Sequence, residues 1–304
     1  MDGLDAKLAA VAACNHSVIT YDDVIKAGGK KHHIRARLDA GRWILVHPRV
    51  YRLAGAPWTF EGIVYAAVCA GGPKTAASVF CAARLHGFGF VRATPEISVP
   101  RHRKFRPDGI IVHESADLDR CGIVKRNGIA VTDEARTLLD IGAALRRRAA
   151  FARAVNQARR LDKVTWHELV TCLAAHARRG RNGVTWMREL IEVGMADDEI
   201  TDTDSELIAL TLIREYGLPE PETQHRVYAD DGRLVAEMDE AYVDRKLNFE
   251  IDGNVHLQPE QKEKDDARDA ELRDVYGWTV RRIWWEIPVR RPAEFLRIVR
   301  SYLH

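Results

Sequence analysis

The sequence predicts an α+β protein that is built from several domains. Its 304 residues are enough for two or three domains of the usual size, and the 46% of apolar residues can fill a sizeable core. Runs with helical spacing of apolar residues alternate with short runs of alternating apolar and polar residues, which are typical of strands. We expect domains at residues 1–58, 59–195 and 203–304, with an acidic linker before the last one.

The formal net charge of +2 hides a strong asymmetry along the chain. Residues 1–196 hold 31 Lys and Arg against 18 Asp and Glu, a balance of +13, whereas residues 197–304 hold 15 against 26, a balance of −11. A basic first part indicates a polyanionic partner such as DNA. A second interpretation, compatible with the first, is that the two parts attract each other and pack.

Composition also limits the cellular setting. No apolar run approaches the roughly 18 residues of a membrane-spanning helix, and the acidic N-terminus lacks the features of a signal peptide. The five cysteines are widely spaced without a C-x-x-C pair, which is typical of reduced thiols. They are Cys14, Cys69, Cys81, Cys121 and Cys172. We therefore expect a cytoplasmic protein without a membrane partner.

The first 58 residues carry the pattern of a winged helix-turn-helix. A helix is expected over 4–15, and Thr20 with Asp23 is typical of a second helix start. A basic helix over 31–40 is followed by two strands within 43–53. This order predicts a recognition helix in the major groove and a hairpin on the DNA backbone.

Basic side chains on these elements are the predicted DNA contacts. Two apolar residues of the second helix, Ile34 and Leu38, are spaced to face the core, and we expect the rest of that helix to be exposed. A basic loop lies between the strands predicted at 96–99 and 110–113. Contact with DNA phosphates and simple exposure to solvent are equal alternatives for this loop. The predicted contacts are Lys30, Lys31, His33, Arg35, Arg37, Arg49, Arg101, Arg103 and Lys104.

Four motifs within residues 1–145 resemble AbiEi-type antitoxins of type IV toxin–antitoxin systems. They are Gly41-Arg42-Trp43, Val46-His47-Pro48-Arg49-Val50-Tyr51-Arg52-Leu53, Ala77-Ser78-x-x-x-Ala82-Ala83-x-Leu85-His86-Gly87 and Val131-Thr132-x-x-x-Arg136-Thr137-Leu138-Leu139-Asp140. The resemblance implies DNA binding, autoregulation and a cognate toxin. Arg49 stands where such families usually have Gly, which puts the wing turn in doubt. Helices at 62–70, at 76–85 and through 133–195 complete an α/β and helical middle region.

A hairpin with acids on one face is expected over residues 234–252. The apolar set is Leu234, Ala236, Met238, Leu247, Phe249 and Ile251. The opposite face gathers Val235 and the four acids Glu237, Asp239, Glu250 and Asp252. Like charges on adjacent strands repel unless a cation lies between them. The pattern therefore predicts a site for Mg²⁺ or Mn²⁺, which prefer carboxylate oxygen.

The same region resembles the very-short-patch-repair-like branch of the PD-(D/E)XK endonucleases. The motifs are Glu250-x-Asp252-Gly253 followed by His256, then Asp265-x-x-Arg268-Asp269, and Gly277-Trp278-x-Val280-x-Arg282. The resemblance covers about residues 203–304 and implies a restriction-endonuclease-like fold with a mixed sheet. It implies Asp239 and Glu250 as metal ligands, joined by Glu206. Asp252 stands where the superfamily often has lysine and counts as a further ligand and catalytic candidate.

The expected mechanism is hydrolysis of a DNA phosphodiester bond. A metal ion on Asp239 and Glu250 lowers the pKa of water, and His256 handles the proton. Arg268 stabilises the added charge, oriented by Asp265; an intrahelical salt bridge between these two is an equal alternative. Of Trp284 and Trp285, alternation sends one to the core and one to the opposite face.

Three functions remain open at this point. The first is a DNA endonuclease targeted by the winged helix. The second is an antitoxin-like repressor whose nuclease fold no longer cuts, which the missing lysine favours. The third is an acidic domain that mimics DNA and covers the basic part. A toxin partner and a homodimer are open alternatives as well.

Overall fold

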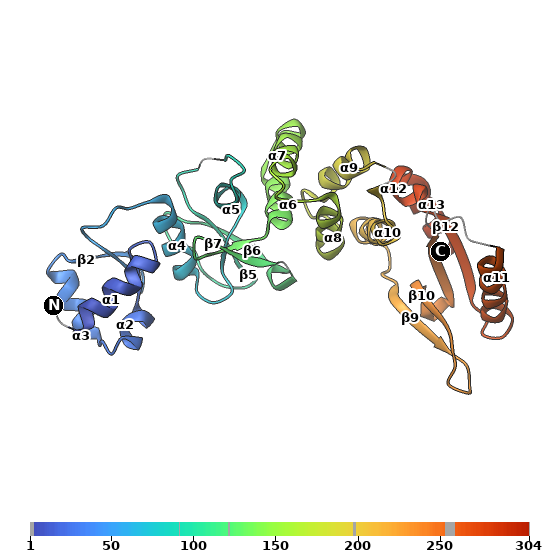
Figure 1. Cartoon of the computed structure of the whole chain (residues 1–304), viewed down its shortest axis with the longest axis horizontal. Helices are drawn as coiled ribbons and strands as arrows, with labels where there is room; N and C mark the ends of the chain where they lie inside the picture. Colours follow the sequence, from blue (N-terminus) through green and yellow to red (C-terminus); the bar gives the residue numbers. More distant parts are fainter. Residues whose placement is uncertain (1–2, 91, 121, 197–198, 253–258, 304) are drawn as a thin grey trace. The chain divides into compact units, whose positions relative to one another are not determined.

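The chain divides into two compact units, Met1–Val164 and Thr165–His304, which we describe separately (Figure 1). The structure is a computed structural model, and it describes residues 3–90, 92–120, 122–196, 199–252 and 259–303, with the backbone alone at 259–266. Both units mix helices with sheets, in agreement with the predicted α+β class. The expected finer division at residue 58 and at 195–203 stays a prediction.

The beginning of the first unit is a small helical cluster on a three-stranded sheet. Its elements are α1 (Gly3–Cys14), β1 (Val18–Thr20), α2 (Tyr21–Lys26), α3 (Lys31–Asp39), β2 (Trp43–His47) and β3 (Val50–Leu53). The strand order is β1-β3-β2, with antiparallel pairing throughout. The capping box at Thr20 and Asp23 is confirmed, since each residue accepts a backbone N–H of the other. Ile34 and Trp43 pack with residues of α1 and α2 in one core.

The turn between β2 and β3 keeps a glycine-type backbone although it carries Arg49. Arg49 has φ of 66°, in the left-handed region that glycine adopts without cost. Its guanidinium lies 4.4 Å from the ring centre of Tyr21 and 2.7 Å from the Asp22 carboxylate. These two contacts of the side chain help to hold the strained turn in place.

The remainder of the first unit is built on a five-stranded mixed sheet. Its elements are α4 (Phe60–Gly71), β4 (Ala76–Ala77), α5 (Val79–His86), β5 (Glu96–Pro100), β6 (Ile111–Ser115), the short 3-10 helix η1 (Leu118–Arg120), β7 (Ile123–Arg126), β8 (Ile129–Thr132), α6 (Glu134–Ala144) and α7 (Arg148–Arg160). The strand order is β6-β5-β4-β8-β7, and α4 packs on β5 and β8. The helix expected over 76–85 is wrong at its start, because Ala76 and Ala77 pair with β5 and β8.

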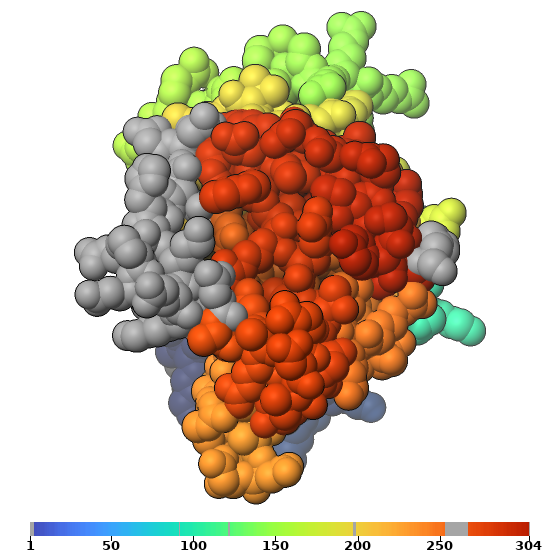
Figure 2. All heavy atoms as spheres, turned by 90° about the vertical axis from the view of Figure 1, so that its right-hand side faces the viewer, coloured from blue at the N-terminus to red at the C-terminus, as the bar shows by residue number. Residues whose placement is uncertain are grey.

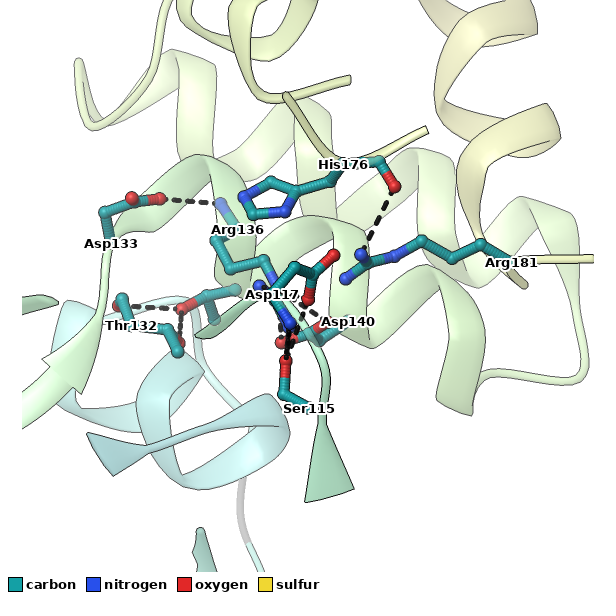
Figure 3. A network of polar contacts seen from close by, with 9 residues as sticks. Ser115, Asp117, Thr132, Asp133, Arg136, Asp140, His176 and Arg181 are labelled. Atoms are coloured by element: carbon teal, nitrogen blue, oxygen red, sulfur yellow. Dashed lines mark hydrogen bonds and ion pairs between the residues drawn. The ribbon is translucent and has the colours of Figure 1, made fainter. Parts of the chain in front are cut away.

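One buried arginine ties α6 to the strand side of this unit. Arg136 donates from Nε to Asp140 at 2.9 Å and from Nη2 to Ser115 Oγ at 3.2 Å. Asp117 lies 3.4 Å from its Nη1, and Ser115 donates to Asp117 at 2.8 Å (Figure 3). The four side chains form a network in which each acid faces a donor.

The second unit carries helices around a four-stranded mixed sheet. Its elements are α8 (Trp166–His176), α9 (Val184–Gly194), α10 (Asp202–Tyr216), β9 (Glu222–Tyr228), β10 (Leu234–Tyr242), the 3-10 turn η3 (Val243–Arg245), β11 (Leu247–Asp252), α11 (Pro259–Asp274), β12 (Thr279–Trp284), α12 (Glu286–Arg290) and α13 (Pro292–Leu303). The strand order is β12-β11-β10-β9; β11 and β12 are parallel and the other pairs antiparallel. Figure 2 shows this unit from the side of α11 to α13, with the hairpin β9–β10 in orange.

The alternation expected at the start of β10 is wrong. Leu234, expected in the core, is 47% exposed, whereas Val235, expected on the acidic face, is buried. The cause is a shift of register between Leu234 and Ala236 in the pairing with β9. A bulge of this kind exchanges the two faces of a strand for one residue. Beyond it, Met238 is buried and Glu237 exposed, as expected.

Candidate functional site

Three elements carry three of the predicted acids of the second unit. Glu206 lies in α10, which begins with a capping box formed by Thr201 and Asp204. Asp239 lies in β10, and Glu250 lies in β11 on the neighbouring strand. The register of these strands, with Glu240 opposite Phe249, brings Asp239 opposite Glu250 one step further along. The two acids are thus neighbours across the sheet.

The pKa values of these acids are raised, chiefly by burial. Burial, with the nearby charges of Asp239 and Asp202, raises the pKa of Glu206 to about 7. Burial also raises the pKa of Asp239, where Arg268 opposes the shift. Burial raises the pKa of Glu250 to about 6, again against the effect of Arg268. Carboxylates in this state bind a proton or a cation readily.

Two arginines lie against Glu250. Arg268 of α11 donates from Nη2 to Glu250 at 3.1 Å, and Arg282 of β12 places its Nε 3.4 Å from the same carboxylate. Arg282 also pairs with Asp269 at 2.8 Å, and Arg268 lies 3.3 Å from Asp269. Arg268 thus makes contacts beyond its own helix. The side chain of Asp265, its other expected partner, lies outside the described residues.

A fourth acid, Glu240, was missed by the sequence reasoning. It is 2% exposed, and within the described residues neither of its carboxylate oxygens has a hydrogen-bond partner. Burial, together with Asp239 and Glu206, raises its pKa to about 8. Asn248 accepts a hydrogen bond from the backbone N–H of Glu240, and its own side-chain NH₂ group also lacks a partner among described residues. Glu240, paired with the buried Phe249, therefore lies on the opposite face of β10 from Asp239 and adds a further buried acid next to the predicted ones.

The other predicted members of the site are placed as follows. Asp252 is half-buried at the end of β11, and its charge raises the pKa of Asp239. Glu237 is exposed and pairs with Arg226 of β9 at 2.8 Å. His256 lies outside the described residues, so its expected role in proton transfer stays a prediction. Trp285 is buried and Trp284 exposed, which confirms the expectation that one of the two belongs to the core.

The acids fit a divalent cation by their chemistry. Asp239 and Glu250 on adjacent strands, with Glu206 nearby, are oxygen donors, and burial raises the pKa of each. In the described part of the chain, however, no three His, Cys, Asp or Glu side chains converge closely enough to hold a metal ion. The cations that contact Glu250 among these residues are Arg268 and Arg282.

The predicted DNA contacts of the first unit divide into exposed and structural residues. Lys30, Lys31 and Arg35 are exposed on or beside α3, and Arg35 pairs with Asp39 at 3.0 Å. His33 is half-buried and accepts a hydrogen bond from the backbone N–H of Lys30 at 3.0 Å. Lys30, Lys31 and Arg35 are therefore accessible to a partner, whereas His33 is accessible only in part.

The prediction that Arg37 is exposed is wrong. It is 5% exposed, and its Nε donates to Asp5 of α1 at 2.7 Å. Its guanidinium also lies over the ring of Trp43. Because Arg37 holds α1 and α3 together from inside, we leave it out of the DNA-facing set.

The basic loop after β5 is similarly divided. Arg101 and Lys104 are exposed. Arg103 instead donates to the backbone carbonyls of Gly71 and Pro73, the second at 2.9 Å, and so fastens the loop to the end of α4. The loop is therefore held by Arg103, and it presents Arg101 and Lys104 to solvent.

Comparisons with known proteins add little to this picture. No protein-family profile matches the chain, and no curated protein matches it. Among solved structures, the crystal structure of RV2827C protein from Mycobacterium tuberculosis is 15% identical, with a TM-score of 0.41, over 74% of this chain and 88% of that chain. A likeness of this size carries no argument about function. No helix in the described residues has both the length and the apolar character needed to cross a membrane.

Proposed function

We propose that this chain is a DNA-binding protein whose second unit is a metal-dependent DNA endonuclease. The observation that carries the proposal is the position of Asp239 opposite Glu250 on neighbouring strands, with Glu206 of α10 near enough for the charge of Asp239 to raise its pKa. Groups with strongly shifted pKa values are concentrated at functional sites. The resemblance of the last hundred residues to PD-(D/E)XK endonucleases supports the same function.

Two finer fold assignments belong to the proposal. The order α1, α2, α3 and the hairpin β2–β3 supports a winged helix-turn-helix in which α3 is the recognition helix. The order β10, β11, α11 and β12 supports a restriction-endonuclease-like fold. DNA is then the partner of both units. A cognate toxin and a homodimer stay predictions, as does a cytoplasmic location.

Each site residue has a defined task in this proposal. Asp239 and Glu250 hold Mg²⁺ or Mn²⁺, with Glu206 and Asp252 as the nearby additional carboxylates. When bound, the cation supplies Lewis-acid polarisation of the phosphate and activation of water. Arg268, next to Glu250, would stabilise the negative charge of the transition state. His256 accepts or donates the proton.

A second function is favoured by a specific observation. Arg268 and Arg282 already neutralise Glu250 in part, and Asp252 replaces the lysine that the superfamily often has. Such a site suits an antitoxin-like repressor in which the ion pairs are structural and no cleavage occurs. The DNA-binding residues of the first unit serve either function.

Cleavage by the full chain separates these two functions. Supercoiled plasmid and short duplexes are incubated with Mg²⁺ or Mn²⁺, with EDTA as the metal-free control. We expect cutting by the wild type and none by Asp239→Asn or Glu250→Gln. Glu294→Gln serves as the matched control, because Glu294 of α13 pairs only locally with Arg291. If all four proteins shift DNA and none cuts it, the repressor is the correct function.

A further inference from the structure

A histidine of α8 is bonded to the first turn of α10. Nδ1 of His167 lies 2.6 Å from the Asp204 carboxylate. An ionised carboxylate only accepts hydrogen bonds, so Nδ1 of His167 carries the proton of this bond. The side chain of His167 is 55% exposed, whereas Asp204 is fully buried. Neither residue is among those that the sequence predicts for the site.

The Asp204 carboxylate has a donor for each of its two oxygen atoms. Oδ1 accepts from His167, and Oδ2 accepts from the backbone N–H of Thr201 at 3.1 Å and from the Thr201 hydroxyl at 2.8 Å. The backbone N–H of Asp204 donates to the same hydroxyl. A buried carboxylate with these donors is held in one position, and the start of a helix favours its negative charge. Asp204 therefore links α8 to the point at which α10 begins.

Glu206, two positions further along α10, points toward the candidate site. Successive residues of an α-helix lie about 100° apart around its axis, so Asp204 and Glu206 lie on nearly opposite sides of α10. The side of Asp204 meets α8, which packs along α10 (Figure 1). The side of Glu206 is near enough to Asp239 of β10 for that charge to raise the pKa of Glu206. The bond from His167 thus holds α10 on one side while Glu206 extends from the other.

We propose that His167 is a positioning residue for the candidate site, which acts through Asp204 to fix the first turn of α10 and so the place of Glu206 near Asp239. The inference rests on the proposed metal-dependent function, in which Glu206 is one of the carboxylates near the cation. A carboxylate that is already held in place loses less conformational freedom when a cation binds. The functional unit then extends beyond the predicted domain at 203–304, because α8 belongs to the second compact unit.

The test measures by calorimetry how tightly Mn²⁺ binds to the full chain without DNA. His167→Ala removes the donor to Asp204, and we expect it to weaken Mn²⁺ binding by roughly 10-fold, the lower end of the effect of residues that orient metal ligands. His167→Asn carries a side-chain N–H as many bonds from the backbone as Nδ1 of histidine. It should therefore bind Mn²⁺ nearly as tightly as the wild type.

The other end of α10 offers a matched control. Thr185 of α9 donates to Glu215 in the last turn of α10, so Thr185→Val also removes one bond between α10 and a neighbouring helix. Glu215 lies nine positions beyond Glu206, about 13 Å along the helix. We expect Thr185→Val to leave Mn²⁺ binding unchanged.

Hydrogen exchange of the backbone amides at 204–207 supplies a readout without the cation. Exchange there should be faster in His167→Ala than in the wild type, because the first turn of α10 opens more often, and His167→Asn should restore the slower rate. Thermal unfolding verifies that each variant folds. If His167→Ala does not fold, His167→Gln takes its place, because its amide nitrogen lies one bond further from the backbone than Nδ1 of histidine.

Three results would overturn the inference and leave the proposed function intact. They are equal Mn²⁺ affinity of the wild type and His167→Ala, equal weakening by Thr185→Val, and binding by His167→Asn as weak as that by His167→Ala. If the wild type binds no Mn²⁺, the proposed function itself fails and the positioning role fails with it. Faster exchange at 204–207 in His167→Ala would then show a bond that serves the fold alone.

Discussion

Each of the two units buries a cluster of charged side chains, but the balance between acids and cations differs between the two clusters. In the first unit, Arg136 lies among Ser115, Asp117 and Asp140, and its acids face donors at distances between 2.8 and 3.4 Å (Figure 3). In the second unit, acids from α10, β10 and β11 outnumber the arginines that reach them. Burial raises the pKa of Glu206, Asp239, Glu240 and Glu250.

This difference separates structural from functional charge. A buried network in which acids and donors match fixes the fold and leaves no capacity for a ligand. A cluster with excess negative charge destabilises the folded state, and that cost is offset only when a proton or cation binds. The second cluster is therefore the better candidate for a site.

The largest expected effect tests the matched network. Replacing Arg136 by Met leaves Asp117 and Asp140 without their buried cation, and we expect a loss of about 3–5 kcal/mol in the stability of the first unit. Urea unfolding measures the effect. Arg153→Met, at an exposed position on α7, is the control and should change stability by less than about 0.5 kcal/mol. Similar midpoints for the two variants would show that the Arg136 network is not structural.

The next effect tests the excess of acid through its pH dependence. Burial raises the pKa of Glu240 in the folded state to about 8, well above its ordinary value of 4.5, so folding favours the protonated form. Stability must then fall as pH rises from about 4.5 to about 8. Glu240→Gln should stabilise the second unit by about 1–3 kcal/mol at pH 8 and by much less at pH 5. The measurement is unfolding in EDTA at both pH values; a pH-independent difference would contradict it.

A smaller effect is expected from metal alone. At ten times its dissociation constant, Mg²⁺ should stabilise the second unit by about 1.4 kcal/mol, because it binds the folded carboxylates. The melting temperature is read with Mg²⁺ and with EDTA, for the wild type and for Asp239→Asn. The shift should vanish in the variant. A shift of the same size in both proteins would place the bound ion elsewhere.

Local patterns explain what the sequence could predict. Glu250 and Asp252 alternate with Phe249 and Ile251, so the sequence predicts that the two acids share a face of the strand. The same alternation predicts that only one of Trp284 and Trp285 is buried. The capping box at Thr20 is equally local. In each case the residues that decide the structure lie within a few positions of one another, where periodicity is informative.

Non-local contacts explain what it could not. The bulge that exposes Leu234 arises from pairing with β9, a strand of mostly exposed residues that the sequence reasoning did not assign. Arg37 is buried by Asp5, which lies 32 residues away. The sequence nevertheless held a signal for the burial of Arg37 and of Glu240. Arg37 follows Ile34 by three positions on the helix, and Glu240 continues the alternation of Ala236 and Met238.

The smallest expected effect concerns an exposed charge that belongs to neither the Arg136 network of the first unit nor the acids of the second. Lys31 at the start of α3 should contact one DNA phosphate, so Lys31→Gln should lower the slope of log affinity against log salt by about 0.9. Lys7→Gln is the matched control, since Lys7 is also exposed, on α1 of the same unit. Affinity for a duplex is measured over a series of salt concentrations. Because both variants lose one charge, an equal change of slope would mean that net charge, rather than docking of α3, governs binding.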